Sequence, residues 1–393
     1  RASTTESEGH RPVRGCIVQS WGLTRKALTP FSIEDVPLGL CTHIIYSYLT
    51  FKEDTGEITG ATASYKDNKR ALKRLFCLKL DDPDLKLIVT IGNGEMNRLF
   101  MKFLPHPNKR QKFVSSAVRW LLKFGFDGLN LHWEGRGPTL CTPFTTLLIK
   151  LIEELREAFA KYKFTLTVQL PACRLSCNVD LDKGMLGKLV DYVFLMTYDY
   201  RSTHLDKTDV HSQLYGRTFD PSETQKENTE DCAGTWVDAG VPKYKIVLGL
   251  STFGKTFTLA NPNEKAILSP VNRNHPQGLP GEITKCKGML GYMEICRYLN
   301  NRAYKREWDA ASQTPFAYSA DQWIGFDDTE SIARKVFFTK GNKLGGVFIW
   351  SLDLDDYTGD CSGTNFPIAR AINSTLSDYN VPTGIVPEGC VAS

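Results

Sequence analysis

Short apolar runs rich in β-branched residues recur along the chain, and longer amphipathic stretches lie between them. Eight of these runs have the length and composition of buried parallel strands. They cover residues 15–20, 43–51, 86–91, 128–133, 165–170, 192–197, 246–250 and 346–350. Eight strands that alternate with helices are what a closed parallel barrel needs. The pattern therefore predicts an α/β fold of the (β/α)8 TIM-barrel type.

Two of the intervening stretches have the spacing of outer helices. Residues 110–124 and 147–155 repeat apolar side chains every three or four positions. The second stretch is preceded by Thr142 and Pro143, an arrangement typical of a helix cap followed by a first-turn proline. Both stretches are predicted to cover the outside of the barrel.

The alternation of apolar runs and amphipathic stretches changes between residues 256 and 323, where proline and glycine are frequent and the apolar segments are shorter. This passage is predicted to be an insertion beside the mouth of the barrel. The domain organisation that follows is an N-terminal tail over 1–13, a barrel over 14–255 and 324–380, the insertion over 256–323, and a C-terminal tail or linker over 381–393.

The composition fits a large globular domain, because 41% of the 393 residues are hydrophobic and 23% are charged. The net charge of +4 is too small to predict a nucleic-acid partner. We find no apolar run that could cross a bilayer, so membrane insertion is not expected. The first residues are polar and do not form a signal peptide, which suggests a mature or trimmed chain.

Eleven cysteines favour disulfide bonds and export, since their spacing differs from that of structural zinc sites. The odd number leaves at least one thiol unpaired within the chain, and Cys390 is the first candidate. Cys173 and Cys177 are close enough to pair locally. A glycosylation sequon at Asn373 agrees with a secreted, extracellular protein. No cluster of His, Asp and Glu suggests a metal, and no cofactor is predicted.

The most informative strand is the one over residues 128–133. Side chains alternate along a strand, so Asn130, His132 and Glu134 share one face. Near the C-terminal end of a barrel strand, that face points into the mouth, where active sites of such barrels lie. The other interpretation is that Asn130 and His132 are hydrogen-bonded interior residues and that Glu134 begins a loop.

From Asp127 to Glu134 the chain reads D-G-L-N-L-H-W-E, which resembles the D-G-x-D-x-D-W-E signature of the glycoside hydrolase family 18 chitinases. Residues 196–199, M-T-Y-D, resemble that family's sixth-strand motif, and similar motifs follow in order over residues 16–379. The resemblance implies that the insertion is a small α+β domain. It also implies disulfides Cys16–Cys41 and Cys296–Cys361.

In that family an acid protonates the leaving oxygen while the substrate's own acetamido oxygen attacks the anomeric carbon. Glu134 matches the acid, and Asp127 matches the first aspartate of the signature. His132 and Asn130 replace the other two aspartates. A neutral imidazole can accept a hydrogen bond from the acetamide, but it cannot supply the negative charge that stabilises the intermediate. Weak or absent hydrolysis is therefore predicted.

Other residues are assigned by resemblance to sugar binding. Trp350 resembles the aromatic floor under the central sugar, although it could instead be a core residue. Tyr198, Asp199 and Met196 belong to the motif that holds the acetamide. Further candidates for the groove are Tyr48, Trp21 and Lys255, of which Lys255 stands for the usual arginine. The remaining departures are Phe253 for the usual tyrosine, Gly94 for the aromatic residue of the third-strand motif S-x-G-G-W, and Gly135 for the tyrosine that usually follows Glu134.

These observations predict a secreted, monomeric chitinase-like protein that binds chitin, chito-oligosaccharides or related N-acetylglucosamine glycans with weak or no hydrolysis. One alternative is an active endochitinase that uses Glu134 as the general acid with substrate assistance. A second alternative is a signalling or protein-partner role that does not involve sugar.

Overall fold

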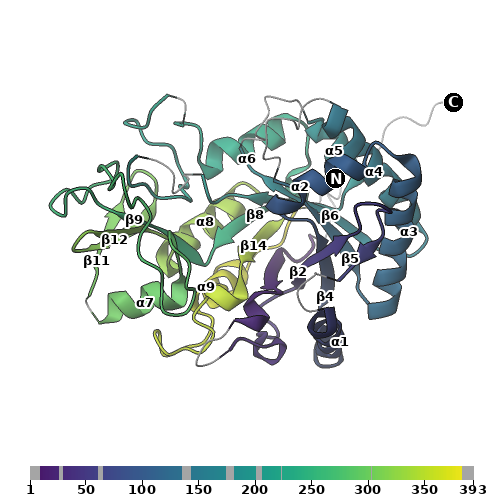
Figure 1. Cartoon of the computed structure of the whole chain (residues 1–393), viewed down its shortest axis with the longest axis horizontal. Coiled ribbons are helices and arrows are strands. Elements are labelled where there is room, and N and C mark those ends of the chain that lie inside the picture. The colour runs from purple at the N-terminus through teal and green to yellow at the C-terminus, as the bar shows by residue number, and fades with distance from the viewer. Residues whose placement is uncertain are drawn as a thin grey trace, which may run out of the picture.

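A computed structural model describes residues 9–25, 30–60, 65–134, 143–173, 181–200, 206–222, 224–301 and 303–382. Its centre is a closed barrel of eight parallel strands in the order β1-β14-β8-β7-β6-β5-β4-β2, which closes because β1 also pairs with β2 (Figure 1). The strands are β1 (Val13–Gln19), β2 (His43–Phe51), β4 (Lys86–Ile91), β5 (Gly128–His132), β6 (Thr165–Pro171), β7 (Tyr192–Met196), β8 (Ile246–Ser251) and β14 (Gly346–Trp350). A short β3 (Ile58–Thr59) pairs antiparallel with β2. The predicted fold class is confirmed.

Helices surround the barrel, as Figure 1 shows. They are α1 (Tyr65–Asp81), α2 (Asn97–Phe103), α3 (Pro107–Phe124), α4 (Pro143–Ala160), α5 (Lys183–Leu189), α6 (Thr229–Asp238), α8 (Thr329–Gly341) and α9 (Pro367–Leu376). The ends of α3 follow from its sequence. Pro107 occupies the first turn, where its missing N–H costs nothing. Gly125 ends the helix in the left-handed region, with φ of 68°.

The barrel strands separate two cores. As the alternation predicts, Leu129 and Leu131 of β5, together with Trp133 just after the strand, pack outward into the layer beneath the helices. Inside the barrel, Ile17, Ile45, Ile88, Phe194, Val247 and Phe348 form a smaller apolar cluster. Polar side chains gather toward the C-terminal ends of the strands. The barrel therefore has an apolar floor beneath a polar mouth.

A second sheet, antiparallel and five-stranded, lies beside the barrel in the order β10-β9-β13-β12-β11 (Figure 1). Its strands are β9 (Phe253–Thr258), β10 (Met289–Gly291), β11 (Lys305–Asp309), β12 (Thr314–Ser319) and β13 (Gln322–Gly325), and α7 (Tyr292–Asn300) packs on it. The sheet begins and ends just outside the predicted range 256–323. Since β9 starts directly after β8, this sheet is fixed to the exit of a barrel strand.

Three disulfides join distant parts of the described chain: Cys16–Cys41, Cys173–Cys232 and Cys296–Cys361. The local pairing of Cys173 with Cys177 is wrong, because the fold brings α6 against the end of β6 and places Cys232 there instead. Cys77 and Cys286 are free and exposed. Cys141, Cys177 and Cys390 lie outside the described residues, as do Thr142, Gly135, residues 1–8 of the N-terminal tail and residues 383–393 of the C-terminal tail.

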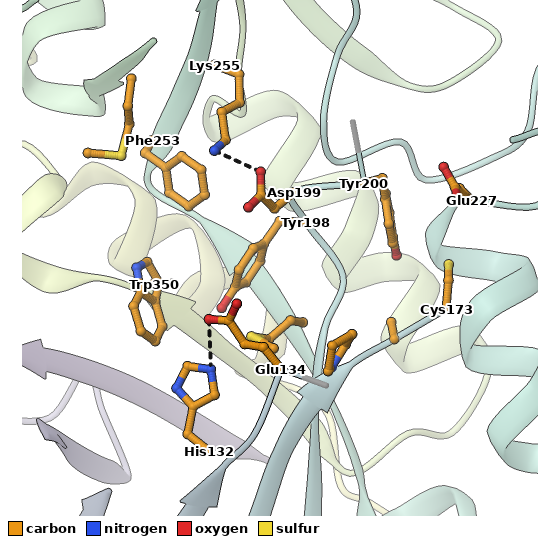
Figure 2. A pocket seen from close by; sticks show the side chains of 14 residues that line it. His132, Glu134, Cys173, Tyr198, Asp199, Tyr200, Glu227, Phe253, Lys255 and Trp350 are labelled. Atoms are coloured by element: carbon orange, nitrogen blue, oxygen red, sulfur yellow. Dashed lines mark ion pairs between the residues drawn. The ribbon is translucent and has the colours of Figure 1, made fainter. Parts of the chain in front are cut away.

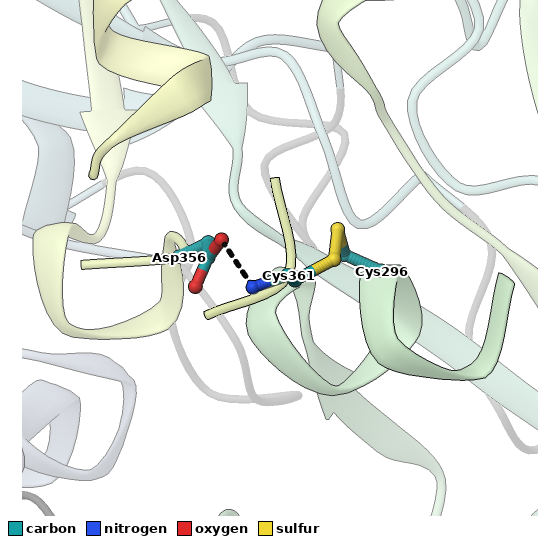
Figure 3. A group of neighbouring side chains, drawn as sticks. All are labelled: Cys296, Asp356 and Cys361. Carbon is teal, nitrogen blue, oxygen red and sulfur yellow. Dashed lines mark hydrogen bonds between the residues drawn. A yellow bond between two sulfur atoms is a disulfide. The ribbon is translucent and has the colours of Figure 1, made fainter. Parts of the chain in front are cut away.

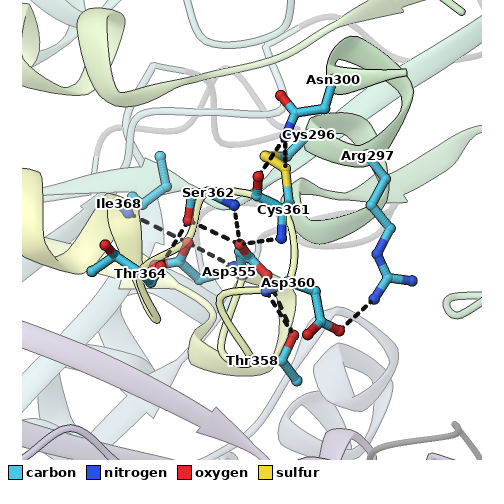
Figure 4. The surroundings of a disulfide bond; sticks show 11 residues. Cys296, Arg297, Asn300, Asp355, Thr358, Asp360, Cys361, Ser362, Thr364 and Ile368 are labelled. Atoms are coloured by element: carbon cyan, nitrogen blue, oxygen red, sulfur yellow. Dashed lines mark hydrogen bonds and ion pairs between the residues drawn. A yellow bond between two sulfur atoms is a disulfide. The ribbon is translucent and has the colours of Figure 1, made fainter.

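The Cys296–Cys361 disulfide ties α7 to the loop that follows β14 (Figure 4). In that loop the carboxylate of Asp356 accepts hydrogen bonds from the backbone N–H groups of Cys361 and Ser362, at 3.1 and 3.0 Å, and from the Ser362 hydroxyl. These contacts hold the exit of the last barrel strand against the second sheet.

Two surface features complete the fold. Asn373 of the sequon lies on α9 and is half-buried. None of the helices in the described ranges has the combination of length and apolar character that a bilayer-crossing helix requires.

Candidate functional site

A pocket of about 360 Å³ opens at the C-terminal ends of the barrel strands (Figure 2). Its lining combines residues from four barrel strands or the segments that follow them with residues of the second sheet. They are His132, Glu134, Pro171, Ala172, Cys173, Met196, Tyr198, Asp199, Tyr200, Glu227, Phe253, Lys255, Met289 and Trp350. Seven of the residues proposed from the sequence therefore meet here: His132, Glu134, Met196, Tyr198, Asp199, Lys255 and Trp350.

Four other candidates do not line this pocket. Asp127 lies at the opposite end of β5, where its carboxylate pairs with Lys79 at 2.8 Å and accepts from the backbone N–H of Leu87 at 2.7 Å. Trp21 is 40% exposed, with the Arg25 guanidinium 4.7 Å from its ring centroid. Tyr48 is half-buried in β2, and Asn130 lies deeper in the barrel.

Asn130 is an interior residue whose amide is fully used. Its Nδ2 donates to Thr90 Oγ1 at 3.1 Å and to Gln169 Oε1 at 3.0 Å, and its Oδ1 accepts from Thr167 Oγ1 at 2.9 Å. The four side chains are buried on four neighbouring positions of β4, β5 and β6. This network supports the floor beneath His132 and does not reach the pocket.

His132 and Glu134 form the centre of the pocket. The imidazole Nε2 lies 3.5 Å from Glu134 Oε1, too far for a good hydrogen bond (Figure 2). His132 is 1% exposed, and neither of its ring nitrogens has a hydrogen-bond partner within the described ranges. Leaving buried polar atoms unpaired is costly, so these nitrogens are available to hydrogen-bond water or a ligand in the pocket.

Tyr198 places a second unpartnered polar atom near this centre. Its hydroxyl is buried without a hydrogen-bond partner in the described part of the chain. Burial, reinforced by the negative charges of Glu134 and Asp199, raises the pKa of the Tyr198 phenol well above its usual value. The phenol therefore stays neutral at physiological pH, and its O–H can donate to an acceptor on a ligand.

Asp199 and Lys255 form one wall of the pocket. Lys255 Nζ lies 2.8 Å from Asp199 Oδ1, and both side chains are partly exposed to the cavity (Figure 2). Asp199 has a positive φ of 61°, a conformation that side-chain-bearing residues adopt rarely. The sequence motif identified Asp199, but nothing in the motif indicates this backbone geometry.

Gly94 borders the Glu134 side chain. It begins the turn η3 (Gly94–Met96) that follows β4. A Cβ built on Gly94 would lie 2.5 Å from Glu134 Oε2, closer than atoms in contact allow. The absence of a side chain at position 94 therefore gives the Glu134 carboxylate the space that it occupies.

Several lining residues were not proposed from the sequence. Pro171 ends β6, and Ala172 and Cys173 follow it directly, so the rule that barrel sites lie at C-terminal strand ends could have found them. Tyr200 and Glu227 come from the connection between β7 and α6, and Met289 comes from β10 of the second sheet. Their positions depend on how these segments fold back, which the local pattern does not indicate.

The pocket is able to bind a polar ligand with an apolar face and to offer it the carboxyl group of Glu134 at its centre. Within the described ranges, the one group with metal-ligand spacing is Cys296, Asp356 and Cys361, remote from the pocket (Figure 3). Its two sulfur atoms are joined in a disulfide, and Asp356 is occupied by the loop hydrogen bonds.

Comparison with known proteins gives a consistent result. Residues 14–355 match the family described as Glycosyl hydrolases family 18. Chitotriosidase-1 of Mus musculus is 31% identical over 95% of this chain and 81% of its own length. Chitinase-3-like protein 2 of Homo sapiens is 30% identical over 92% of each chain.

Solved structures agree with this assignment. A Group IV chitinase of Ostrinia furnacalis in complex with allosamidin superposes with a TM-score of 0.88 at 28% identity, covering 93% of this chain and 99% of the other. Human YKL-39, described as a pseudo-chitinase with retained chitooligosaccharide binding properties, gives a TM-score of 0.86 at 29% identity over 93% and 100% of the two chains. Relatives thus include chitinases and a protein described as a pseudo-chitinase.

Proposed function

Because this chain belongs to glycosyl hydrolase family 18, we propose that it is a secreted chitinase-like protein. It binds chitin, chito-oligosaccharides or related N-acetylglucosamine glycans, and it hydrolyses them weakly or not at all. The observation that carries the proposal is the imidazole of His132, which faces Glu134 at 3.5 Å where the family signature has a carboxylate.

The loss of that carboxylate affects the reaction itself. Substrate-assisted hydrolysis develops positive charge on the acetamido group, and a carboxylate beside it stabilises that charge. A neutral imidazole can only accept a hydrogen bond, and a protonated one repels the charge. Removing one such electrostatic partner commonly lowers turnover by about a hundredfold to a thousandfold.

The pocket keeps the elements that bind sugar. Trp350 offers an indole face on the pocket side of β14, and such faces stack on the apolar face of a sugar ring. The Tyr198 hydroxyl and the His132 nitrogens lack partners within the described ranges and are placed to bind the acetamido group. The relative YKL-39, with its retained chitooligosaccharide binding, supports the separation of binding from hydrolysis.

Calorimetry with chitotetraose and chitohexaose, together with a fluorogenic chito-oligosaccharide assay, tests the proposal. We expect micromolar to millimolar binding with turnover at least about a hundredfold below that of an active relative assayed in parallel. No binding heat at millimolar sugar would overturn the binding role. Cellohexaose, which lacks the acetamido group, is the matched ligand control.

An active endochitinase is the second candidate, because Glu134, Tyr198 and Asp199 are retained in one pocket. In that case the fluorogenic substrate would be turned over steadily, and Glu134→Gln would abolish turnover while leaving sugar affinity within a few-fold. Steady turnover that survives Glu134→Gln would indicate a contaminant.

Export and assembly are part of the proposal. Three disulfides within the described ranges support folding in an oxidising compartment. We propose a monomer that is glycosylated at Asn373. Expression in a secretory host should give a monomer by analytical ultracentrifugation. Treatment with an N-glycosidase should lower the mass of the wild type by the mass of a glycan, and it should leave the mass of Asn373→Gln unchanged.

A further inference from the structure

His211 is a fully buried histidine behind the Asp199–Lys255 wall, with 0% of its surface exposed. It lies on the long connection between β7 and α6 and was not singled out from the sequence. Its ring stacks on Phe253, with 4.9 Å between centroids and 21° between planes. It thus contacts the strand that carries Lys255.

Both ring nitrogens of His211 bind the backbone of the pocket wall. The backbone N–H of Asp199 donates to Nδ1 at 3.2 Å, and Nε2 lies 3.2 Å from the carbonyl oxygen of Phe253. A backbone N–H is always a donor, so Nδ1 must be the unprotonated nitrogen. Nε2 then carries the proton and donates to Phe253. Only the neutral Nε2–H tautomer makes both hydrogen bonds.

These two bonds connect the exits of two barrel strands. Asp199 follows β7 and has the positive φ of 61°, while Phe253 opens β9 and lies two residues before Lys255. The ion pair between Asp199 and Lys255 spans the same gap at 2.8 Å on the pocket side. His211 therefore connects the same two segments on the buried side that the ion pair connects on the pocket side.

We propose that His211 is a positioning residue of the sugar pocket: its neutral Nε2–H tautomer fixes the backbone of Asp199 and Phe253 and so sets the geometry of the Asp199–Lys255 wall. The inference rests on the proposed function only for what binds at that wall. The connection that His211 makes between Asp199 and Phe253 is argued from the hydrogen bonds alone.

The environment keeps this tautomer neutral. Burial lowers the pKa of His211 from 6.5 to about 4. Four charged groups act on it from the elements packed around it. Asp327 and Asp199 favour protonation, and Lys255 and Lys335 oppose it. Below about pH 4, a proton on Nδ1 would remove the acceptor for the Asp199 N–H.

Two substitutions at this position separate the hydrogen bonds from the ring packing. His211→Phe keeps a flat ring against Phe253 and removes both bonds. His211→Asn restores an acceptor near the place of Nδ1. His43→Phe is the matched control, because His43 is also a histidine whose pKa burial lowers to about 4, but it lies at the start of β2, at the opposite end of the barrel.

The first measurement needs no ligand. Amide hydrogen exchange at Asp199, corrected for intrinsic rate, should accelerate about tenfold in His211→Phe and stay near wild type in His211→Asn and His43→Phe. In the wild type the same protection should fall as the pH approaches 4, while His211→Asn shows no such step. Equal Asp199 exchange in wild type and His211→Phe would overturn the proposal.

The second measurement is calorimetric affinity for chitohexaose at pH 7. We expect His211→Phe to weaken binding about tenfold, His211→Asn to recover most of it, and His43→Phe to bind as wild type. Wild-type affinity in His211→Phe also overturns the positioning role. If the wild type binds no chito-oligosaccharide, the proposed function fails and Asp199 exchange still decides the role of His211.

Discussion

The imidazole of His132 meets the indole of Trp350 edge to face, with 5.6 Å between ring centroids and 79° between planes. The residue that departs from the family signature therefore lies directly beside the aromatic surface proposed to carry the sugar. Under the proposed function, a change at position 132 acts on the same ligand that Trp350 would hold. Binding and hydrolysis can be tested separately by changing these two residues.

Restoring the carboxylate should restore chemistry. We expect His132→Asp to raise turnover of a fluorogenic chito-oligosaccharide by about a hundredfold over wild type, because the acetamido group regains its negatively charged partner. A steady-state assay measures this. An unchanged rate in His132→Asp and in its combination with Asn130→Asp would place the defect elsewhere in the groove.

The second substitution in that pair should lower the stability of the fold. Asn130 donates to Thr90 and Gln169, and an aspartate would turn both contacts into acceptor pairs. Gln169 can compensate by turning its amide, since its Nε2 lacks a hydrogen-bond partner within the described ranges. The Thr90 hydroxyl can also rotate to donate. These hydrogen bonds only partly offset the cost of burying a carboxylate, or of keeping it protonated at pH 7. We expect Asn130→Asp to lower the free energy of unfolding by about 3 kcal/mol, measured by urea denaturation.

Trp350→Ala should weaken sugar binding without unfolding the protein. Loss of one aromatic stacking surface should weaken chitohexaose affinity by about tenfold or more. Trp308→Ala is the matched control, because Trp308 lies on β11 of the second sheet beneath the Arg306 guanidinium and away from the pocket lining. Equal affinity in wild type and Trp350→Ala, measured by calorimetry, would contradict the assignment.

Gly94→Ala should displace the Glu134 carboxylate. The added Cβ would lie 2.5 Å from Glu134 Oε2, so this flexible side chain must move. We expect any residual hydrolysis, including that of His132→Asp, to fall about tenfold or more, because the acid is misplaced. Gly234→Ala in α6, where a Cβ meets nothing within 4 Å, is the control and should leave the rate unchanged. A rate in Gly94→Ala equal to wild type would mean that Glu134 reaches the same position regardless.

Stability should decline in acid through the buried histidines. The pKa of His211 falls from 6.5 in the unfolded chain to about 4 in the fold, so the unfolded state binds the extra proton between these values. The stability that comes from keeping His211 neutral is complete above pH 6.5 and is lost as the pH falls toward 4, by about 3 kcal/mol. His43 acts in the same direction.

Urea denaturation at pH 7 and pH 4.5 measures this decline. In His211→Asn the difference in the free energy of unfolding between pH 7 and pH 4.5 should be smaller than in wild type by about 2 kcal/mol, since one titrating group is gone. An identical difference in wild type and His211→Asn would show that other groups dominate the acid response.

The barrel could be predicted from the sequence because its signals are local. The apolar runs over 43–51, 86–91 and 346–350 coincide with the observed strands, since burial on both sides makes most of their positions apolar. The alternation along β5 also placed Leu131 outward and Asn130 inward. Each conclusion needed only neighbouring residues.

The rest of the site depends on contacts between distant segments. Cys173 pairs with Cys232, a partner 59 residues away, and only the packing of α6 against β6 brings them together. The role proposed for His211 depends on the Asp199 backbone, whose positive φ has no signal in the local sequence. The motif likewise marked Gly94 as a lost aromatic residue, whereas the fold shows that its missing side chain accommodates Glu134.

The Cys173–Cys232 bond also decides how the protein must be produced. Cys173 lines the pocket, and its partner anchors it to α6. A bacterial cytoplasm, where thiols stay reduced, would yield a chain in which this edge of the pocket has lost its covalent anchor. Weak sugar binding by such a preparation would reflect the host rather than the sequence.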